Sequence, residues 1–481
     1  MKLISELLQS ISPLTIHGTT DQEVSSIEHD SRKCTVNSLF IAIRGTTTND
    51  GHNFIEQAIQ NGARTIVCEV LPNILNEQLT FIQVADSRES AALLSNSFFD
   101  YPSKSLRIIG VTGTNGKTTV TYLLKQLLEF SGEKIGLIGT TGNMIGNTLV
   151  PTNYTTPEAP ELHKLLAQMR DKCITTVVME VSSHALELKR VLGIHFSAAL
   201  FTNLTHDHLD FHGSMNKYAE AKQMLFDSLD ETCIAIFNGD SEFSKVLSQH
   251  TKANIFFSGR NENSDFLITD ETFTTTTTQF SLNTTQYSTP LLGKFNIDNI
   301  SLCIGLCVLW GMQTTDIGHI LETINGAPGR MERIQVNGRV AVIDYAHTPD
   351  ALENTLSTCR ELLQSNQKLT VIFGCGGNRD TSKRAKMGKI AEQYADTIIL
   401  TNDNPRMESP DSIINDILSG IYYKDAVSIN PDRAKAIETG ILNSGETDII
   451  VIAGKGHETY QIIGNEKYYF SDKDEVLKYL Q

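Results

Sequence analysis

Short apolar runs alternate with longer stretches of helical character through most of this chain. In its middle part, runs rich in β-branched residues occupy positions 106–111, 176–181, 198–203 and 234–238, and each is typical of a buried strand. Strands that alternate with helices are characteristic of βαβ units, in which the strands lie parallel in one sheet. The pattern therefore predicts an α/β protein with a parallel sheet in its middle part.

The length of the chain predicts about three domains, because 481 residues exceed what one hydrophobic core organises. Strand-like runs at 38–43 and 63–68, with a helical stretch near 53–61, predict a small N-terminal α/β domain over residues 1–88. Residues 89–328 then form the central domain that contains the parallel sheet.

A third group of strand-like runs follows residues 326–329, whose sequence Gly-Ala-Pro-Gly predicts a linker. Helical patterns separate these runs, which lie at 340–344, 369–374, 397–401 and 449–454. They predict a Rossmann-like C-terminal domain over residues 329–481. The first run is not followed by G-x-G-x-x-G, so a dinucleotide-binding role is not indicated.

A threonine-rich segment at 273–280 is low in sequence complexity. Threonine is β-branched and favours strands, and aromatic residues flank the segment. We therefore expect a surface hairpin rather than a disordered stretch.

Composition and charge narrow the class of protein. The formal net charge of -16 argues against a nucleic-acid partner held by bulk electrostatics, because domains that bind nucleic acids are usually basic. No apolar run approaches the roughly 18 residues of a membrane span, and the N-terminus has no signal-like apolar region. The 8 cysteines form no C-x-x-C pair and are expected to be reduced thiols. We therefore expect a cytoplasmic protein without a membrane span. We also expect a monomer, although composition does not establish this.

The run at 106–111 leads into the segment Gly-Thr-Asn-Gly-Lys-Thr-Thr at 113–119, which opens a helical pattern. A strand, a Gly-rich turn and a helix N-terminus surround an anion with backbone N–H groups, while a lysine adds charge and a threonine hydroxyl can reach Mg²⁺. The motif has the short G-x-x-G-K-T spacing, because Val111 stands where the longer form has glycine. The alternative is a Gly-rich turn with a surface lysine. We favour a nucleotide-phosphate loop, with Lys117 as an exposed loop residue.

Polar side chains gather where two of the predicted strands end. Glu180 ends one strand and is followed by Ser-Ser-His184, and the segment 203–212, with three further histidines and two aspartates, follows the next strand. Because ligands bind at the carboxyl ends of strands in open α/β sheets, we expect one functional site here. A carboxylate and an imidazole beside a phosphate loop favour Mg²⁺, with zinc as the competing metal. Glu180 by itself could instead be a capping or surface acid.

The predicted C-terminal domain has four polar loops, each directly after a strand. They lie at 344–350, 374–380, 402–406 and 454–458 and contain arginines as well as carboxylates. Arginine binds a carboxylate with two parallel hydrogen bonds, and aspartate or glutamate receives an ammonium group, so this combination suits a zwitterionic ligand. Each loop taken alone could be a solvated turn.

Taken together, these motifs resemble the Mur ligases, the ATP-dependent amino-acid ligases that build the stem peptide of peptidoglycan. The resemblance covers all three predicted domains and rests on positions 112–119, 180–184, 207–210, 221–226, 344–351 and 454–458. Within the family, these motifs are similar to those of the ligases that add the third residue to UDP-N-acetylmuramoyl-L-alanyl-D-glutamate. The sequence Asp-Asn-Pro-Arg at 403–406 is similar to the form associated with meso-diaminopimelate rather than L-lysine.

The resemblance implies ATP and Mg²⁺ as cofactors and assigns residues to both. The implied ATP site comprises Gly113, Thr114, Asn115, Gly116, Lys117, Thr118, Thr119, Asn296, Asn299, Arg330 and Asp344. The implied metal ligands are Thr118, Glu180, His208 and Lys222, the last as a carbamate (N6-carboxylysine). Lys117, His208 and Lys222 are the implied catalytic residues. The residue pattern alone leaves Lys222 an ordinary helix-surface lysine.

The resemblance also implies two substrate sites. The UDP-sugar peptide would be bound by Ser31, Thr155, Thr156, Ser182 and Arg190, and the incoming amino acid by Arg379, Asp403, Asn404, Arg406, Gly454 and Glu458. Two positions depart from the family pattern. Leu188 stands where glutamine is common, which puts one peptide contact in doubt, and Asn378 replaces a usual aspartate and could alter the hydrogen bonding around Arg379.

The implied reaction joins the γ-carboxyl group of D-glutamate to the amine of diaminopimelate through an acyl phosphate. Two alternatives share some of the motifs. A folylpolyglutamate synthetase has a similar phosphate loop and similar chemistry, but the N-terminal domain and the Asp-Asn-Pro-Arg sequence disfavour it. A nucleotide-dependent switch would use the phosphate loop without ligating anything, and the polar C-terminal loops argue against it.

Overall fold

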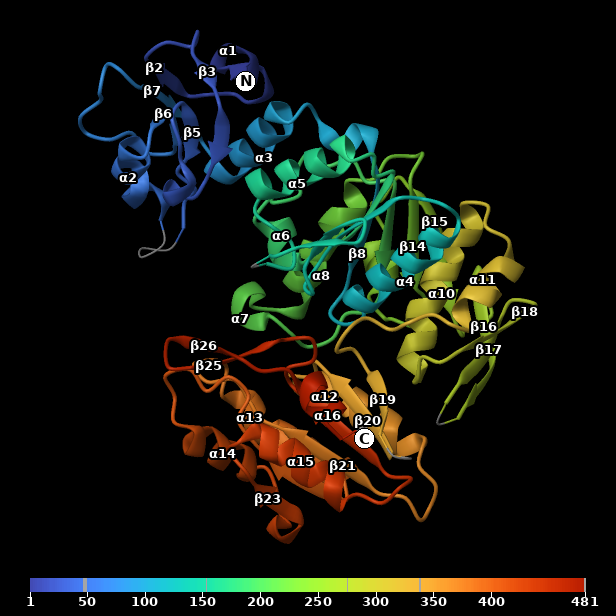
Figure 1. Ribbon diagram of the computed structural model, residues 1–481. Coiled ribbons are helices and arrows are strands. Elements are labelled where there is room, and N and C mark those ends of the chain that lie inside the picture. The colour runs from blue at the N-terminus through green and yellow to red at the C-terminus, as the bar shows by residue number, and fades with distance from the viewer. Residues whose placement is uncertain (46–49, 153, 275, 337–338, 480–481) are drawn as a thin grey trace.

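The chain folds around three main sheets that follow one another along the molecule (Figure 1). The computed structural model describes residues 1–45, 50–152, 154–274, 276–336 and 339–479. Within these residues the three sheets contain five, eleven and six strands in chain order. The α/β class and the organisation in three domains are thereby confirmed.

The N-terminal sheet has the strand order β2-β7-β6-β5-β4, and all neighbours except β2 and β7 run parallel. The strands of this region are β1 (Lys2–Leu3), β2 (Thr15–His17), β3 (Glu23–Val24), β4 (Ser26–Glu28), β5 (Ser38–Ile41), β6 (Ala63–Cys68) and β7 (Thr80–Gln83). Its helices are α1 (Ile4–Leu7), α2 (Ile55–Gln60) and α3 (Ser87–Phe98). Helix α3 packs against α1 and also against α5 (Ala159–Asp171). Helix α3 continues past residue 88, where the sequence predicts a domain boundary. The predicted domain boundaries at 88 and 328 stay predictions.

The central sheet has the order β11-β10-β9-β12-β8-β13-β14-β15-β16-β17-β18. Its strands are β8 (Arg107–Thr112), β9 (Ile135–Ile138), β10 (Asn143–Ile145), β11 (Thr148–Val150), β12 (Thr176–Glu180), β13 (Ala198–Phe201), β14 (Ile234–Asn238), β15 (Asn254–Gly259), β16 (Phe266–Phe273), β17 (Thr278–Leu282) and β18 (Thr285–Thr289). Its helices are α4 (Lys117–Phe130), α5, α6 (Ser183–Glu187), α7 (Leu209–His212), α8 (Met215–Asp227), α9 (Ser244–Leu247), α10 (Lys294–Leu309) and α11 (Thr314–Leu321).

Adjacent residues of the central strands bury their side chains on opposite faces of the sheet, as the strand geometry requires. Ile108 and Val177 belong to the core beneath α5 and α8, whereas Ile109 and Val178 belong to the core beneath α4 and α10. Because both faces are covered by helices, the inner positions of these strands are apolar on both sides of the sheet. This explains why their sequences are continuous apolar runs rather than alternating ones.

The predicted parallel sheet is parallel only in its middle, from β9 to β16. Antiparallel strands extend it at both edges, β10 and β11 on one side and β17 and β18 on the other. The threonine-rich segment lies at the second edge, where β16 and β17 pair as the predicted hairpin. Thr275, which belongs to this segment, lies outside the described residues.

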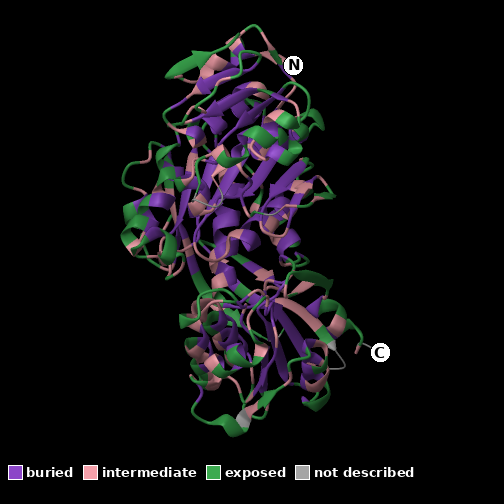
Figure 2. Cartoon of the chain, turned by 90° about the vertical axis from the view of Figure 1, so that its left-hand side faces the viewer, coloured by how far each residue is buried: buried purple, intermediate pink, exposed green. Residues whose placement is uncertain are grey.

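The C-terminal sheet has the order β19-β20-β24-β21-β22-β23, parallel except for β19 at its edge. Its strands are β19 (Glu332–Val336), β20 (Arg339–Asp344), β21 (Leu369–Phe373), β22 (Thr397–Leu400), β23 (Val427–Ile429) and β24 (Ile449–Ala453), with a separate hairpin of β25 (Tyr460–Ile463) and β26 (Glu466–Tyr469). Its helices are α12 (Pro349–Glu361), α13 (Ser382–Tyr394), α14 (Pro410–Leu418), α15 (Arg433–Asn443) and α16 (Asp472–Leu477). Figure 2 shows the buried strands, in purple, at the centre of each region. Among the described helices, none combines the length and the apolar character needed to cross a membrane.

Candidate active site

The predicted phosphate loop forms the junction between β8 and α4. Gly113 and Gly116 in this loop both have positive φ angles, 151° and 87°. A Cβ atom at Gly113 would lie 1.9 Å from Thr202 Oγ1, and one at Gly116 would lie 2.4 Å from Asn299 Oδ1. Glycine is therefore required at both positions, by backbone conformation and by space.

The loop that follows β13 supports the phosphate loop from the side. The backbone oxygen of Asn203 accepts a hydrogen bond from Thr114 N, and its side-chain oxygen accepts one from Asn115 N, each at 2.9 Å. The Thr202 hydroxyl donates to Asn115 O at 2.5 Å. Since the first N–H groups of α4 have no partner inside the helix, they are oriented to receive an anion above this fixed loop.

Lys117 is the first residue of α4 and is half-buried, so the prediction of an exposed loop lysine was wrong. Its Nζ donates to the backbone oxygens of Gly113 and Thr114, both at 2.8 Å. Burial lowers the pKa of Lys117, while the carboxylates of Glu180 and Asp207 act in the opposite direction. The ammonium group thus folds back across the loop, where it can neutralise phosphate charge.

The two polar clusters predicted after β12 and β13 lie together. The ring centroids of His184 and His208 are 4.9 Å apart, and His212 Nε2 lies 3.0 Å from Ser183 Oγ. Burial lowers the pKa of His184 to about 4. It also lowers the pKa of His208. Both imidazoles are therefore neutral at neutral pH and able to bind a cation through a ring nitrogen.

Glu180 is buried at the end of β12, with 1% of its surface exposed. Its carboxylate accepts hydrogen bonds from Thr140 N at 2.9 Å and from Thr140 Oγ1 at 3.1 Å. A Cβ atom at Gly139 would lie 2.4 Å from Glu180 Oε1, so the adjacent backbone approaches closely. The structure therefore excludes the surface acid that the sequence allowed and shows a fixed, buried carboxylate.

Lys222 lies on α8 and is almost wholly buried, with 1% exposure, so it is not a helix-surface lysine. Its Nζ donates to Gly113 O at 2.9 Å and lies 4.5 Å from the centroid of the Tyr218 ring. Burial lowers the pKa of Lys222 well below its usual value, and nearby Lys117 lowers it further. This side chain therefore reaches the phosphate loop in surroundings that favour the neutral form of its amine.

The chemistry of these groups fits Mg²⁺. Thr118 supplies a buried hydroxyl, Glu180 a buried carboxylate and His208 a neutral ring. Oxygen ligands are those that Mg²⁺ prefers, and plain Lys222 cannot serve as one without modification. The Thr118 hydroxyl also accepts a hydrogen bond from Arg330 at 3.4 Å, which places a cation next to the same hydroxyl.

A different cluster has the composition of a zinc site. Within the described part of the chain, His195, Asp230 and Cys233 are the only three such side chains whose ligand atoms all lie within 4.8 Å of one another. They stand before β13 and β14, at the sheet edge opposite the phosphate loop. No such group of three lies at the predicted site among the described residues, and the choice between Mg²⁺ and zinc there stays a prediction.

The residues predicted to contact adenine and ribose lie beside the phosphate loop. Asn296 and Asn299 are buried on α10, and Asn296 Nδ2 donates to Leu292 O at 2.8 Å. Asp344 is also buried, and accepts from Met331 N at 2.6 Å. Burial raises the pKa of Asp344. These amides and this carboxylate are held by internal hydrogen bonds.

Two contacts join the phosphate loop to the C-terminal domain. Asp350 Oδ2 accepts from Asn115 Nδ2 at 2.8 Å and from Thr205 Oγ1 at 3.0 Å. Arg330 reaches Thr118 and lies over the Tyr345 ring, 4.5 Å from its centroid. The C-terminal domain therefore touches the residues predicted to bind ATP.

Most of the residues predicted to bind the UDP-sugar peptide form one network in the central domain. The Thr156 hydroxyl donates to Glu180 O at 2.8 Å and accepts from Ser182 N at 3.2 Å. Arg190 donates to Thr156 O at 3.0 Å and pairs with Glu158 at 2.6 Å. Arg190 Nε is buried and has no hydrogen-bond partner among the described residues. A buried donor of this kind is suited to an acceptor on a ligand.

Two further residues of this predicted set lie at the margins of the network. The Thr155 hydroxyl is 3.0 Å from that of Thr140, which holds Glu180. Ser31 belongs to the N-terminal domain, where its hydroxyl donates to Gln57 at 2.7 Å. An ion pair between Lys33 and Glu161 at 2.5 Å joins this turn of the N-terminal domain to α5.

The predicted amino-acid-binding residues gather at the carboxyl ends of neighbouring strands of the C-terminal sheet. Asn404 Nδ2 donates to Glu458 Oε2 at 3.0 Å, and Lys455, which is wholly buried, donates to the same oxygen at 3.0 Å. Asp403 is also buried, and burial raises its pKa. A Cβ atom at Gly454 would lie 2.5 Å from Asp403 Oδ2, so glycine is needed there. The set combines carboxylates and a cation, as a zwitterion requires.

The two predicted arginines differ in exposure. Arg379 is exposed, whereas Arg406 is half-buried and its NH1 donates to Gly377 O at 2.9 Å. The substituted Asn378 adopts a left-handed conformation, with φ of 52°, and its side-chain oxygen accepts from Met407 N at 3.1 Å. Aspartate could accept the same bond, so this departure preserves the hydrogen bonding of the loop.

Sequence reasoning missed four residues that the structure places at these sites. They are Thr140, Asp350, Arg384 and Lys455. Lys455 and Asp350 fall inside motifs that were recognised, so their charge was an available signal. No local sequence signal pointed to Thr140 or Arg384, because they act through contacts between segments far apart in the sequence.

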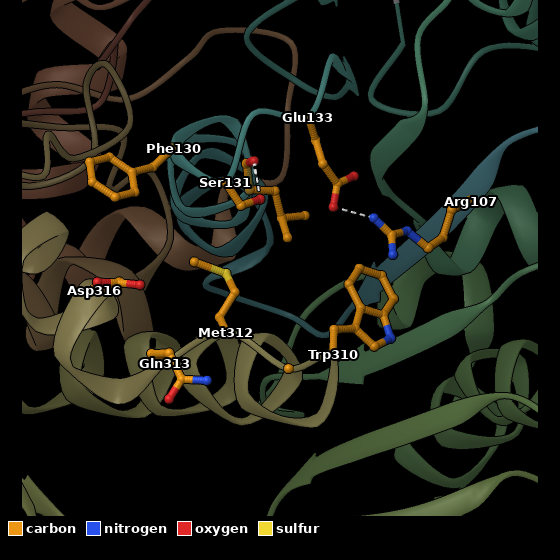
Figure 3. Close-up of a pocket in the computed structure, with 10 residues that line it drawn as sticks. Arg107, Phe130, Ser131, Glu133, Trp310, Met312, Gln313 and Asp316 are labelled. Carbon is orange, nitrogen blue, oxygen red and sulfur yellow. Dashed lines mark hydrogen bonds and ion pairs between the residues drawn. The ribbon is translucent and has the colours of Figure 1, made fainter.

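A separate hollow of about 330 Å³ lies at the opposite edge of the central sheet and contains none of the predicted site residues (Figure 3). In it the Arg107 guanidinium lies 4.2 Å from the centroid of the Trp310 indole and pairs with Glu133. The predicted site residues lie elsewhere, on segments of all three domains.

Comparison with known proteins covers the whole chain. Three family models match it: "Mur ligase family, catalytic domain" over residues 23–98, "Mur ligase middle domain" over 111–307, and "Mur ligase, glutamate ligase domain" over 329–456. The segments follow the three sheets in order.

Several curated relatives share the full length of the chain. A UDP-N-acetylmuramoyl-L-alanyl-D-glutamate–2,6-diaminopimelate ligase of Bacteroides fragilis is 41% identical over 484 residues, which cover 99% of each chain. A relative of the same name from Geobacillus thermodenitrificans is 40% identical, with 98% of each chain covered. A solved structure under that name is 32% identical, has a TM-score of 0.71, and is matched over 98% of its length and 100% of this chain. The chain belongs to the Mur ligase family.

Proposed function

We propose that this protein is an ATP-dependent ligase that joins meso-diaminopimelate to the γ-carboxyl group of UDP-N-acetylmuramoyl-L-alanyl-D-glutamate. The observation that carries the proposal is the end-to-end likeness to relatives of that name, at 41% identity over 99% of both chains. The polar loops at the edges of the central and C-terminal sheets support it, since they suit a nucleotide and a zwitterion. The reaction would supply a peptidoglycan precursor in the cytoplasm, and we expect the enzyme to act as a monomer.

ATP would bind with its phosphates at the N-terminus of α4. Lys117 supplies the positive charge there, and the N–H groups of the first helical turn supply hydrogen bonds. Asn296, Asn299, Arg330 and Asp344 would line the neighbouring space for the nucleoside. Positioning of this kind is the main catalytic resource for phosphoryl transfer, because the reaction needs little covalent help from the protein.

Mg²⁺ would be held by Thr118, Glu180, His208 and a carbamate on Lys222. When bound, the ion would neutralise phosphate charge and orient the terminal phosphate. Lys222 is suited to modification, because a neutral amine attacks CO₂ to form a carbamate with loss of a proton. Burial lowers the pKa of Lys222 and so favours the neutral form of its amine.

The chemical sequence has two transfers. The γ-carboxylate of D-glutamate attacks the terminal phosphorus of ATP, giving an acyl phosphate and ADP. The amine of diaminopimelate then attacks the acyl carbon, phosphate leaves with the bonding electrons, and the amine loses a proton. Asp350 and Arg330, which connect the C-terminal domain to the phosphate loop, would help to keep water from the acyl phosphate.

The amino acid would be oriented by charges at both of its ends. Asp403 and Glu458 would receive ammonium, and Arg406 would pair with the distal carboxylate that diaminopimelate has and lysine lacks. Both hydrogen bonds that the Arg406 guanidinium makes to described residues come from NH1, which leaves the fork of Nε and NH2 for this carboxylate. The dipeptide nucleotide would reach the same point through Ser182, Thr156 and Arg190.

The proposal is tested by the release of phosphate from ATP with different acceptors and amino acids. We expect release when UDP-N-acetylmuramoyl-L-alanyl-D-glutamate and meso-diaminopimelate are both present, and little when L-lysine replaces diaminopimelate. Folate with glutamate should give no release. Release with folate would indicate a folylpolyglutamate synthetase, and equal use of L-lysine would remove the protein from the diaminopimelate branch.

Replacing Arg406 by alanine should raise the KM for diaminopimelate far more than the KM for ATP. The wild-type arginine faces a carboxylate in one substrate and an ammonium group in the other, so we expect it to contribute roughly a thousandfold to selectivity over lysine. The measurement is kcat/KM for both amino acids with both enzymes.

A matched control is Arg360→Ala, which removes an arginine of the same domain that pairs with Asp396 at 2.9 Å. This control should leave the KM for diaminopimelate unchanged. Unaltered selectivity in Arg406→Ala would contradict the assigned role.

A further inference from the structure

Two loops of the C-terminal sheet carry the arginines assigned to the amino acid. We call residues 374–380, after β21, the Arg379 loop, and residues 401–409, after β22, the Arg406 loop. Their strands are parallel neighbours, so both loops leave the same edge of the sheet side by side.

The backbones of the two loops are in direct contact. Gly377 N donates to Asn404 O at 2.9 Å, and Arg406 NH1 donates to Gly377 O at 2.9 Å. A Cβ atom at Gly377 would lie 1.9 Å from Pro405 O. The position of the Arg406 side chain therefore depends on the position of the Arg379 loop.

Arg384, on α13, contacts both loops. Its side chain has no exposed surface. It binds both carboxylate oxygens of Glu408, at 2.6 and 2.8 Å, and donates to Gly376 O at 3.3 Å. Its remaining ion pair is with Asp416 of α14, at 2.8 Å. One buried guanidinium group thus binds the Arg379 loop through Gly376 and the Arg406 loop through Glu408.

Glu408 and Asn378 complete the connection between the loops. Glu408 Oε2 accepts from Asn378 N at 2.9 Å, and Met407 N donates to Asn378 Oδ1 at 3.1 Å. The Arg384 guanidinium lowers the pKa of Glu408 to about 2, so this carboxylate stays charged at working pH. Bidentate pairs of this kind restrict geometry as well as add energy.

We propose that Arg384 and Glu408 are positioning residues for amino-acid selection. They hold the Arg379 and Arg406 loops in a fixed position relative to each other. Neither residue needs to touch the amino acid. They fix the distance between the guanidinium groups that would meet the carboxylates of a diamino dicarboxylic acid. The inference rests on the proposed function, because it concerns the same substrate site.

A purely structural role predicts a different result. If the network only stabilised the domain, its loss would lower the melting temperature without selective effects on one substrate. If the network fixes the relative position of the two loops, its loss should raise the KM for diaminopimelate while the KM for ATP stays the same. Misplacement of about 1 Å is enough to cost a hundredfold in a well-positioned site.

The experiment compares Glu408→Ala and Glu408→Gln with the control Asp416→Asn. The control weakens the other ion pair of Arg384 and touches neither loop. The KM values for diaminopimelate, L-lysine and ATP are measured together with the melting temperature. Asn378→Gly is added because glycine accepts the left-handed backbone but cannot accept the Met407 bond.

We expect Glu408→Ala to raise the KM for diaminopimelate about tenfold or more and to reduce selectivity over L-lysine. Glu408→Gln keeps an acceptor for Asn378 N and should have a smaller effect. Asp416→Asn should leave all three KM values within about twofold. If Glu408→Ala does not fold, Glu408→Gln and Asn378→Gly provide the same test through the KM for diaminopimelate.

An unchanged KM for diaminopimelate in the folded variants, or an equal rise in the KM for ATP, would overturn the inference. Arg406→Ala and the wild-type enzyme are measured in the same series. If the wild-type enzyme does not use diaminopimelate, the proposed function fails. If it does, and only Arg406→Ala is impaired, the proposed function stands and the positioning role of Glu408 is refuted.

Discussion

Replacing Lys117 by alanine should lower kcat by on the order of 10²–10³-fold while the protein stays folded. The reason is that the Lys117 ammonium group folds over the phosphate loop, with bonds of 2.8 Å to the oxygens of Gly113 and Thr114. In the transition state it would face the charge that develops on the transferred phosphoryl group. Loss of the two hydrogen bonds is partly offset by removal of a half-buried cation, so stability should change by no more than about 2 kcal/mol.

The measurement combines kcat for phosphate release with thermal unfolding of the same preparation. Lys125→Ala is a matched control, because Lys125 lies on the same helix and pairs with Glu129 at 2.6 Å, away from the loop. The control should retain its activity. If Lys117→Ala unfolds, and its folded fraction has normal specific activity, the residue has only a structural role.

Replacing Lys222 by alanine should also remove most of the activity, by on the order of 10²–10³-fold in kcat. Lys222 is buried against the phosphate loop, 2.9 Å from Gly113 O, and the shift of its pKa favours the neutral amine that CO₂ requires. As a carbamate it would present anionic oxygens beside Thr118 and Glu180. Alanine has no amine and cannot form the carbamate.

The modification itself can be observed. Wild-type enzyme freed of CO₂ should lose activity and regain it when bicarbonate is added, and bicarbonate labelled with carbon-13 should give a carbamate signal by NMR. Lys222→Ala should show neither the recovery nor the signal. Lys217→Ala is the control, since Lys217 is an exposed residue of the same helix and should behave as wild type.

Full activity in Lys222→Ala would exclude an essential role for this side chain. Activity that is indifferent to bicarbonate, with Lys222→Ala still inactive, would keep the residue but remove the carbamate. These two outcomes separate the role of the side chain from its chemical form.

Much of the fold was predictable from local pattern. The continuous apolar runs ending near Val111 and Glu180 identified buried strands, because strands covered on both faces have no polar side. The pattern did not reveal the antiparallel strands at the edges of the central sheet. Those strands are short, and their place in the sheet depends on pairing with distant segments rather than on their own composition.

Part of the candidate site was also predictable. The glycines at 113 and 116 and the residues that follow them specify a strand, a tight turn and a helix within one short segment. The joining of the His184 and His208 clusters followed from the rule that ligands gather where parallel strands end. The exposure of Lys117 was predicted wrongly, because burial depends on what packs against a residue and not on its neighbours in the chain.

The sequence by itself determined the buried central strands, the phosphate loop and the charged loops that suit a zwitterion, since each is encoded within a few consecutive residues. The tertiary structure alone decided that Asn115 meets Asp350, although 235 positions separate them. It also decided that Lys222 is buried against Gly113 and that Arg384 joins two loops. These contacts arise from the packing of whole domains and sheets, and no local pattern carries that information.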